Sequence, residues 1–311
     1  MIISASRRTD IPAFYSEWFF NRIKEGYVLV RNPMNAHQIS RISLSPDVVD
    51  CIVFWTKNPK PMLDRLDELN DYNYYFQFTL NSYNKDIETN VPSKNTEVIE
   101  TFKVLSDKIG EDRVIWRYDP IIINEEYTID YHIKYFEKLA CLLDGKFKNC
   151  VISFVDYYKK NAVNFRENNI YEPIIEDMRC IAKNFSDIAK KYDFAITTCA
   201  EEIGLNEYGI EHGKCIDDKL IEKLVGGEIN VLKDKNQRDV CGCVESLDIG
   251  LYNSCLHGCK YCYANYSWNS VMKNYNKYDV NSPILCSSIS SDDIIWDRKV
   301  KSLVEDQFKM W

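Results

Sequence analysis

Apolar runs of strand length alternate along the chain with amphipathic stretches of helix length. This rhythm is typical of a parallel α/β fold. The predicted strands are 1–6, 51–56, 74–80, 114–118, 150–155, 194–198 and 246–252, with an inserted hairpin at 27–31 and 39–44. The predicted helices are 15–24, 62–69, 96–108, 129–143, 174–191, 263–275 and 302–310. The pattern therefore predicts a partial or complete parallel (β/α) barrel in the style of triosephosphate isomerase.

The length of 311 residues suits one large barrel or two modest domains. We divide the chain into barrel strands and helices at 1–198 and a cysteine-bearing insertion at 199–245. The last strand, a cysteine loop and a helix occupy 246–281, and 282–311 form a C-terminal tail.

Polar side chains follow the predicted strands. In barrels of this type the functional residues lie at the C-terminal ends of the strands, so these side chains should meet at one mouth. The alternative, for any one of these residues, is that it is polar only because the strand leaves the core there and enters solvent. Candidates are Ser6, Arg7, Arg8, Thr9, Asp10, Lys57, Gln77, Thr79, Arg117 and Asp119. Lys57, Arg117 and Asp119 are the predicted catalytic residues. Lys57 and Arg117 can bind a carboxylate or another anion.

The charge balance limits the possible partners. The chain has 47 acidic and 39 basic residues and a net charge of −8, which leaves no broad basic face for duplex nucleic acid. We find no signal peptide and no apolar run of membrane-spanning length. Twelve cysteines in such a chain indicate metal binding rather than disulfides. We expect a soluble, cytoplasmic protein from a reducing, anaerobic setting.

The main candidate for chemistry is a loop near the C-terminus that carries Cys255, Cys259 and Cys262 at the spacing C-x3-C-x2-C. Cysteine thiolate is the usual ligand of iron–sulfur clusters. Three cysteines leave one iron of a four-iron cluster without a protein ligand, and an open position marks a reactive metal site. Gly258 would allow the tight turn that the spacing needs. A structural zinc site or a set of buried thiols is the alternative.

The spacing, with Tyr261 just before the third cysteine, resembles the signature of the radical S-adenosylmethionine enzymes. The resemblance implies a [4Fe-4S] cluster whose open iron chelates S-adenosylmethionine. One electron then cleaves the sulfonium to give a 5′-deoxyadenosyl radical, which abstracts hydrogen from a substrate. It also implies an electron donor such as flavodoxin or ferredoxin. The residues expected to hold S-adenosylmethionine are Ser6, Arg7, Arg8, Thr9, Asp10, Gln77, Thr79 and Tyr261.

The position of this loop is unusual, because members of that superfamily normally carry it after the first barrel strand. A circular permutation would reconcile the order and would place 246–252 beside 1–6, with 6–10 near the cysteine loop. The run 52–123 is similar to the middle of spore photoproduct lyase-like radical enzymes, through Thr56-Lys57 and Asp119-Pro120-Ile121. The whole chain resembles an uncharacterised bacterial and phage family with this C-terminal motif, which implies an architecture but no reaction.

Four more cysteines, Cys199, Cys215, Cys241 and Cys243, lie between the last regular strand and the loop. They form a complete ligand set for a second four-iron cluster. A zinc site and buried apolar thiols remain alternatives. We expect a radical enzyme acting on a small molecule or a modified nucleotide or base. The competing hypotheses are an iron–sulfur electron-transfer or redox-sensing protein and a zinc-stapled binding module.

Overall fold

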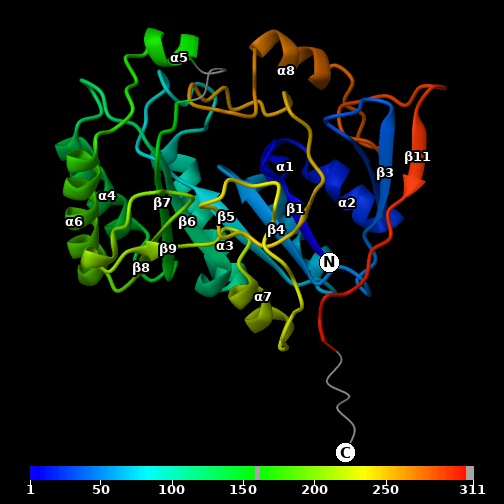
Figure 1. The fold of residues 1–311 in the computed structure, drawn as a ribbon, viewed down its shortest axis with the longest axis horizontal. Coiled ribbons are helices and arrows are strands. Elements are labelled where there is room, and N and C mark those ends of the chain that lie inside the picture. The colour runs from blue at the N-terminus through cyan, green and yellow to red at the C-terminus, as the bar shows by residue number, and fades with distance from the viewer. Residues whose placement is uncertain (158–161, 306–311) are drawn as a thin grey trace, which may run out of the picture.

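A sheet of eight parallel strands forms the centre of the computed structural model, which describes residues 1–157 and 162–305 (Figure 1). The strand order is β10-β1-β4-β5-β6-β7-β8-β9, and in the described part of the chain no ladder joins the outer strands β9 and β10. The strands are β1 Ile2–Ala5, β4 Cys51–Thr56, β5 Tyr74–Thr79, β6 Val114–Ile121, β7 Asn149–Phe154, β8 Ala195–Thr198, β9 Glu211–His212 and β10 Leu247–Asp248. The predicted α/β fold with a large parallel sheet is confirmed.

The N-terminal strand β1 lies between β4 and the C-terminal strand β10. Ile3 pairs with Ile52 on one side and with Leu247 on the other, and both ladders are parallel. The predicted neighbourhood of 1–6 and 246–252 is thus confirmed. β10 is shorter than predicted, because beyond Asp248 the chain turns across the end of β1 at Gly250.

Helices connect these strands. They are α1 Ile11–Phe14, α2 Ser16–Glu25, η1 Lys60–Leu69, η2 Lys94–Val98, α3 Ile99–Ile109, η3 Glu111–Arg113, α4 Ile129–Leu142, α5 Ala162–Glu167, α6 Ile175–Lys191, η5 Asn206–Tyr208, α7 Asp218–Val225 and α8 Trp268–Tyr275. The helix predicted over 62–69 is a 3₁₀ helix in η1. Every helix in residues 1–157 and 162–305 is too short or too polar to cross a bilayer.

Two predicted helices near the C-terminus differ from the structure. The helix predicted over 263–275 begins only at Trp268, because the Ser267 side chain accepts the Ser270 N–H and caps it there. Residues 302–305 are not helical, and Val304 forms an antiparallel bridge with Ile229 instead. The rest of the predicted 302–310 helix lies outside the described residues.

The two faces of the sheet pack against different partners. Side chains alternate along each strand, so Ile52 and Phe54 of β4 pack against the helices while Cys51 and Val53 face the other way. The first face forms the main core with α2, η1, α3, α4 and α6. The second face is covered by α7 and by the segment that carries Cys215, Cys241 and Cys243. The predicted insertion 199–245 therefore lies against the sheet.

A separate three-stranded sheet packs beside α2. Its strands are β2 Tyr27–Arg31, β3 Gln38–Ser43 and β11 Ile294–Asp297, in the order β11-β3-β2. β2 and β3 form the predicted antiparallel hairpin, and β11 of the tail adds to it in parallel. The C-terminal tail is thus tied to an N-terminal hairpin (Figure 1).

Candidate functional site

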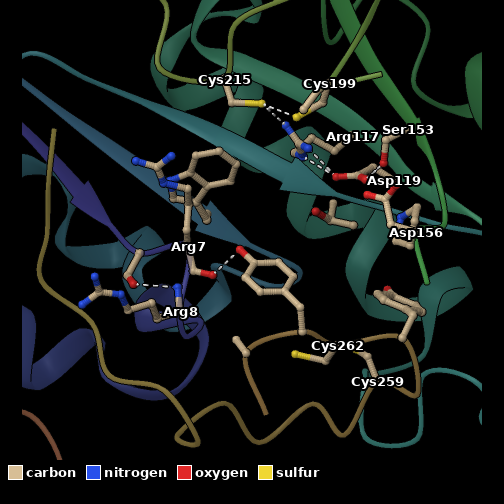
Figure 2. Close-up of a pocket in the computed structure, with 18 of the residues that line it drawn as sticks. Arg7, Arg8, Arg117, Asp119, Ser153, Asp156, Cys199, Cys215, Cys259 and Cys262 are labelled. Carbon is tan, nitrogen blue, oxygen red and sulfur yellow. Dashed lines mark hydrogen bonds and ion pairs between the residues drawn. The ribbon is translucent and has the colours of Figure 1, made fainter. Parts of the chain in front are cut away.

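A cavity of about 450 Å³ opens where the parallel strands end, and the predicted site residues line it (Figure 2). Gln77 is the exception: it is buried behind the cavity wall, where it hydrogen bonds to Arg117 and to the Cys215 carbonyl. The lining includes Ser6, Arg7, Arg8, Thr9, Asp10, Lys57, Thr79, Arg117, Asp119, Cys199, Cys215, Cys241, Cys243, Cys255, Cys259, Tyr261 and Cys262. The structure therefore brings both cysteine sets and the strand ends to one space.

The cysteine loop follows β10 and is held by an acidic loop, residues 86–93, between β5 and η2. Asn90 N–H donates to the His257 carbonyl at 2.9 Å, and Glu88 forms a backbone bridge with Cys259. Gly258 has a φ of +67°, the left-handed conformation expected of the tight turn. These backbone contacts fix the loop against a segment about 170 residues earlier in the chain.

The three thiols of the loop are half-buried and face the cavity. Burial raises the pKa of Cys255, Cys259 and Cys262, for Cys259 to about 12. The Lys57 ammonium opposes this by lowering the pKa of Cys259. Desolvation disfavours a thiolate without a cation beside it, so these thiols need a positive partner to become anionic ligands.

Asp10 joins the cysteine loop to the ends of two strands. Its Oδ2 accepts from the Lys57 N–H at 2.7 Å and lies 2.8 Å from His257 Nε2. Its Oδ1 accepts from the Ala13 N–H at 2.9 Å and caps α1. Both carboxylate oxygens are therefore occupied. His257 Nδ1 is buried and has no hydrogen-bond partner in the described structure, although it belongs to the cavity wall.

Glu88 is a site residue that sequence reasoning missed. It is buried, and its carboxylate contacts Lys57 at 2.8 Å, Lys94 at 2.5 Å and the Tyr261 hydroxyl at 2.5 Å. Burial alone would raise the pKa of Glu88, but the two ammonium groups outweigh it and hold that pKa below its usual range. The only sequence signal was its place in an acidic loop, which is also typical of a solvated surface.

The segment after β1 is held in place by hydrogen bonds to Asp248 of β10. Ser6 Oγ donates to Asp248 Oδ1 at 2.6 Å, and the Arg7 N–H donates to Oδ2 at 2.8 Å. The Arg8 guanidinium lies over the Tyr252 ring. Thr9 is buried, and its Oγ1 has no hydrogen-bond partner in the described structure. Of the predicted S-adenosylmethionine contacts, Thr9 is thus one with a hydrogen-bonding group still available.

On the opposite wall, β6 presents an arginine–aspartate pair (Figure 2). Arg117 is buried, and its Nε donates to Asp119 Oδ2 at 2.9 Å. Asp119 Oδ1 accepts from the Ser153 hydroxyl. The register of β6 against β7 shifts between Tyr118 and Ile121, and such a bulge re-aims side chains at a sheet edge. Asp119 itself lines the cavity.

The four other predicted cysteines gather beside Arg117. Cys199 Sγ and Cys215 Sγ are 3.1 Å apart, and an Arg117 amino group donates to Cys215 Sγ at 2.7 Å. Cys215 also contacts Cys243, which in turn contacts Cys241. Contacts between the neighbouring thiols lower the pKa of Cys199 to about 7 and lower that of Cys243, and the same contacts raise the pKa of Cys215 and of Cys241.

Ligation of a single metal ion is a separate question. Among residues 1–157 and 162–305, no three His, Cys, Asp or Glu side chains stand close enough together to ligate one ion. A four-iron cluster takes one thiolate for each ligated iron rather than gathering all ligands on one atom. The donor set of the loop, three thiols facing one cavity with no carboxylate among them, fits such a cluster.

A family model described as "Domain of unknown function (DUF1848)" matches residues 2–264, which include all eight strands of the parallel sheet and Cys255, Cys259 and Cys262 of the cysteine loop. A search among curated proteins found no match to the chain.

Proposed function

The chain belongs to the DUF1848 family, and we propose that this member is a radical S-adenosylmethionine enzyme. Cys255, Cys259 and Cys262 would hold a [4Fe-4S] cluster, which when bound supplies the electron that cleaves S-adenosylmethionine and so starts hydrogen abstraction from a substrate. One observation carries the proposal: three thiols of a single loop line the same cavity as the polar ends of the parallel strands.

In this proposal the sheet is a circularly permuted version of the superfamily's barrel. The cysteine loop directly follows β10, and β10 pairs in parallel with β1. If the present ends of the chain were joined and the chain began at β10 instead, it would have a first strand followed by a cysteine loop. The pairing of Ile3 with Leu247 and the Asp10–His257 contact support this reading.

The residues near the loop fall into two roles. Ser6 and Arg7 hydrogen bond to Asp248, and Asp10 contacts His257 of the cysteine loop. We therefore assign these three residues to positioning the strand ends and the loop. Thr9 Oγ1 is buried at the cavity and unpartnered in the described structure, so it is the better candidate to contact S-adenosylmethionine. Thr79 also lines the cavity.

Lys57 and Tyr261 lie beside the proposed cluster, and both are held there by hydrogen bonds to Glu88. Both donate to its Oε1, which orients the Lys57 ammonium toward the loop. That positive charge favours the thiolate form of Cys259, which a metal ligand requires. We therefore assign Lys57 to stabilising the anionic ligand set rather than to proton transfer.

Arg117 and Asp119, on the far wall, are the proposed substrate contacts. The cavity volume of about 450 Å³ falls in the range of small-molecule sites. The Trp55 ring lies near the guanidinium groups of both Arg7 (5.9 Å) and Arg117 (5.2 Å) and belongs to the lining. An aromatic ring and a buried arginine suit a small molecule or a modified nucleotide or base. An electron donor such as flavodoxin or ferredoxin would reduce the cluster.

The test is anaerobic reconstitution with iron and sulfide, followed by reduction in the presence of S-adenosylmethionine. We expect 5′-deoxyadenosine and methionine, and an electron paramagnetic signal that changes when S-adenosylmethionine is added. The C255A/C259A/C262A variant should form neither product. The C141A/C180A variant, which removes two exposed cysteines of helices α4 and α6, is the matched control and should behave as the wild type. Cleavage by the loop variant would refute the proposal.

A further inference from the structure

The second group of cysteines lies on the face of the sheet that α7 covers, opposite the face that packs against α2, η1, α3, α4 and α6. Cys199 follows β8, Cys215 precedes α7, and Cys241 and Cys243 precede β10. Three separate segments of the chain therefore converge on one point. Their sulfurs form a continuous series of contacts that begins with the 3.1 Å pair Cys199–Cys215. Buried cysteines that merely fill a core have no reason to gather in this way.

Positive charge surrounds these sulfurs. Arg117 donates to Cys215 Sγ at 2.7 Å, and the arginine is almost completely buried. Arg7, which also contacts the Trp55 ring, is close enough to Cys243 for their charges to interact. The Arg117 guanidinium pairs with Asp119 and at the same time donates to Cys215 Sγ, so a cysteine ligand at this position keeps a charged hydrogen-bond donor.

We propose that Cys199, Cys215, Cys241 and Cys243 are the four ligands of a second [4Fe-4S] cluster, placed across the cavity from the cysteine loop. The proposal does not depend on cleavage of S-adenosylmethionine by the first cluster. Figure 2 shows Cys199 and Cys215 on the side of the cavity opposite Cys259 and Cys262. A fully ligated cluster has no open iron, so this centre would take part through its charge and redox state rather than by binding substrate.

The arrangement distinguishes this proposal from two simpler ones. A zinc ion needs its four sulfurs about 2.3 Å from one atom, and among residues 1–157 and 162–305 no three His, Cys, Asp or Glu side chains are placed to hold one ion. A disulfide would use only Cys199 and Cys215 and would leave Cys243 and its neighbour unexplained. A four-iron cluster uses all four thiols, one at each iron.

The experiment removes the first cluster and asks what remains. The C255A/C259A/C262A variant, reconstituted anaerobically with iron and sulfide, should retain about four irons and four sulfides per chain. Its reduced form should give a four-iron electron paramagnetic signal that is insensitive to S-adenosylmethionine. Adding C243A should abolish both. C51A is the matched control, because Cys51 is buried against the same face of the sheet and lies outside the group.

Each outcome bears on the proposal. Retention of iron in the loop variant and its loss on adding C243A support the second cluster. A loop variant with no iron, or one that binds zinc alone, overturns it. Circular dichroism of the C243A variant shows whether a loss of iron reflects loss of the ligand or of the fold. If wild-type protein cleaves S-adenosylmethionine with about four irons in total, this inference fails while the proposed function stands.

Discussion

His257 Nε2 lies 2.8 Å from Asp10 Oδ2, and this contact joins two loops that are 247 residues apart in the sequence. The same Asp10 oxygen accepts the Lys57 N–H, so one carboxylate ties together the ends of β1 and β4 and the cysteine loop. Because Asp10 is buried, the donors that it satisfies cannot turn to water if it is removed. The cysteine loop therefore depends on an N-terminal residue for its position.

The D10A variant should have a free energy of unfolding lower by about 2–4 kcal/mol, since it strands buried donors and removes the cap of α1. Urea denaturation would measure the loss, and iron content after reconstitution should fall as well. D47A is the control, because Asp47 is exposed and its carboxylate accepts one long hydrogen bond, 3.4 Å, from Ser45. Equal stability of D10A and wild type would show that the carboxylate does not hold the loops together.

Gly250 allows β10 to close on β1. A Cβ added at this position would stand 2.6 Å from Ser6 Cβ, closer than real atoms approach. We expect G250A to lower the free energy of unfolding by about 1–3 kcal/mol, because the two strand ends must separate. G204A is the control, since a Cβ there would meet only Asn206 at 3.7 Å. Unchanged stability of G250A in urea denaturation would mean that the strand ends are loosely packed.

The sequence predicted the features that repeat along the chain. Alternating apolar and amphipathic stretches located β1, β4, β5, β6, β7 and β8, and the order of the cysteine loop predicted that β10 lies beside β1. The rule that sites lie at strand ends then brought together residues as distant as Ser6 and Cys262. The strand positions rest on local patterns, whereas the pairing of β10 with β1 was expected from the resemblance to the radical S-adenosylmethionine enzymes.

The features that escaped prediction depend on partners far away in the sequence. β9 has two residues and β11 is held by pairing with β3, so neither carries a pattern of its own. Glu88 looks like a surface acid until Lys57 and Lys94 are folded against it. α7 was missed although Asp217 caps its start and Gly226 ends it, because the segment was taken only as a carrier of cysteines.

Glu88 should be important for stability as well as for the site. In E88Q the Lys57 and Lys94 ammonium groups would remain partly buried beside a neutral amide, and breaking a buried ion pair from one side costs about 3–5 kcal/mol. Urea denaturation at neutral pH would measure this. E137Q, which removes the partner of Lys191 in an exposed ion pair, should change stability far less. Comparable effects of the two variants would contradict the special role of Glu88.

His132 should make the protein less stable in acid. Burial lowers the pKa of His132 to about 4, while a histidine in the unfolded chain titrates near about 6.5. Between these values the unfolded state binds a proton that the folded state does not, so stability falls as the pH drops from about 6.5 to about 4. The loss from this group should approach about 3 kcal/mol. Urea denaturation at a series of pH values would measure it.

The variant H132Q distinguishes the contribution of His132 to the pH dependence of stability from that of the carboxylates, which titrate in the same pH range. His132 accepts from or donates to the Tyr118 hydroxyl through Nδ1 and contacts the Ile122 carbonyl through Nε2, so H132Q will lower stability at every pH. The slope of its free energy of unfolding against pH should nevertheless be smaller than that of wild type by as much as one proton, because the group that charges only on unfolding is gone. Parallel slopes for H132Q and wild type would show that His132 does not remain neutral in the folded protein.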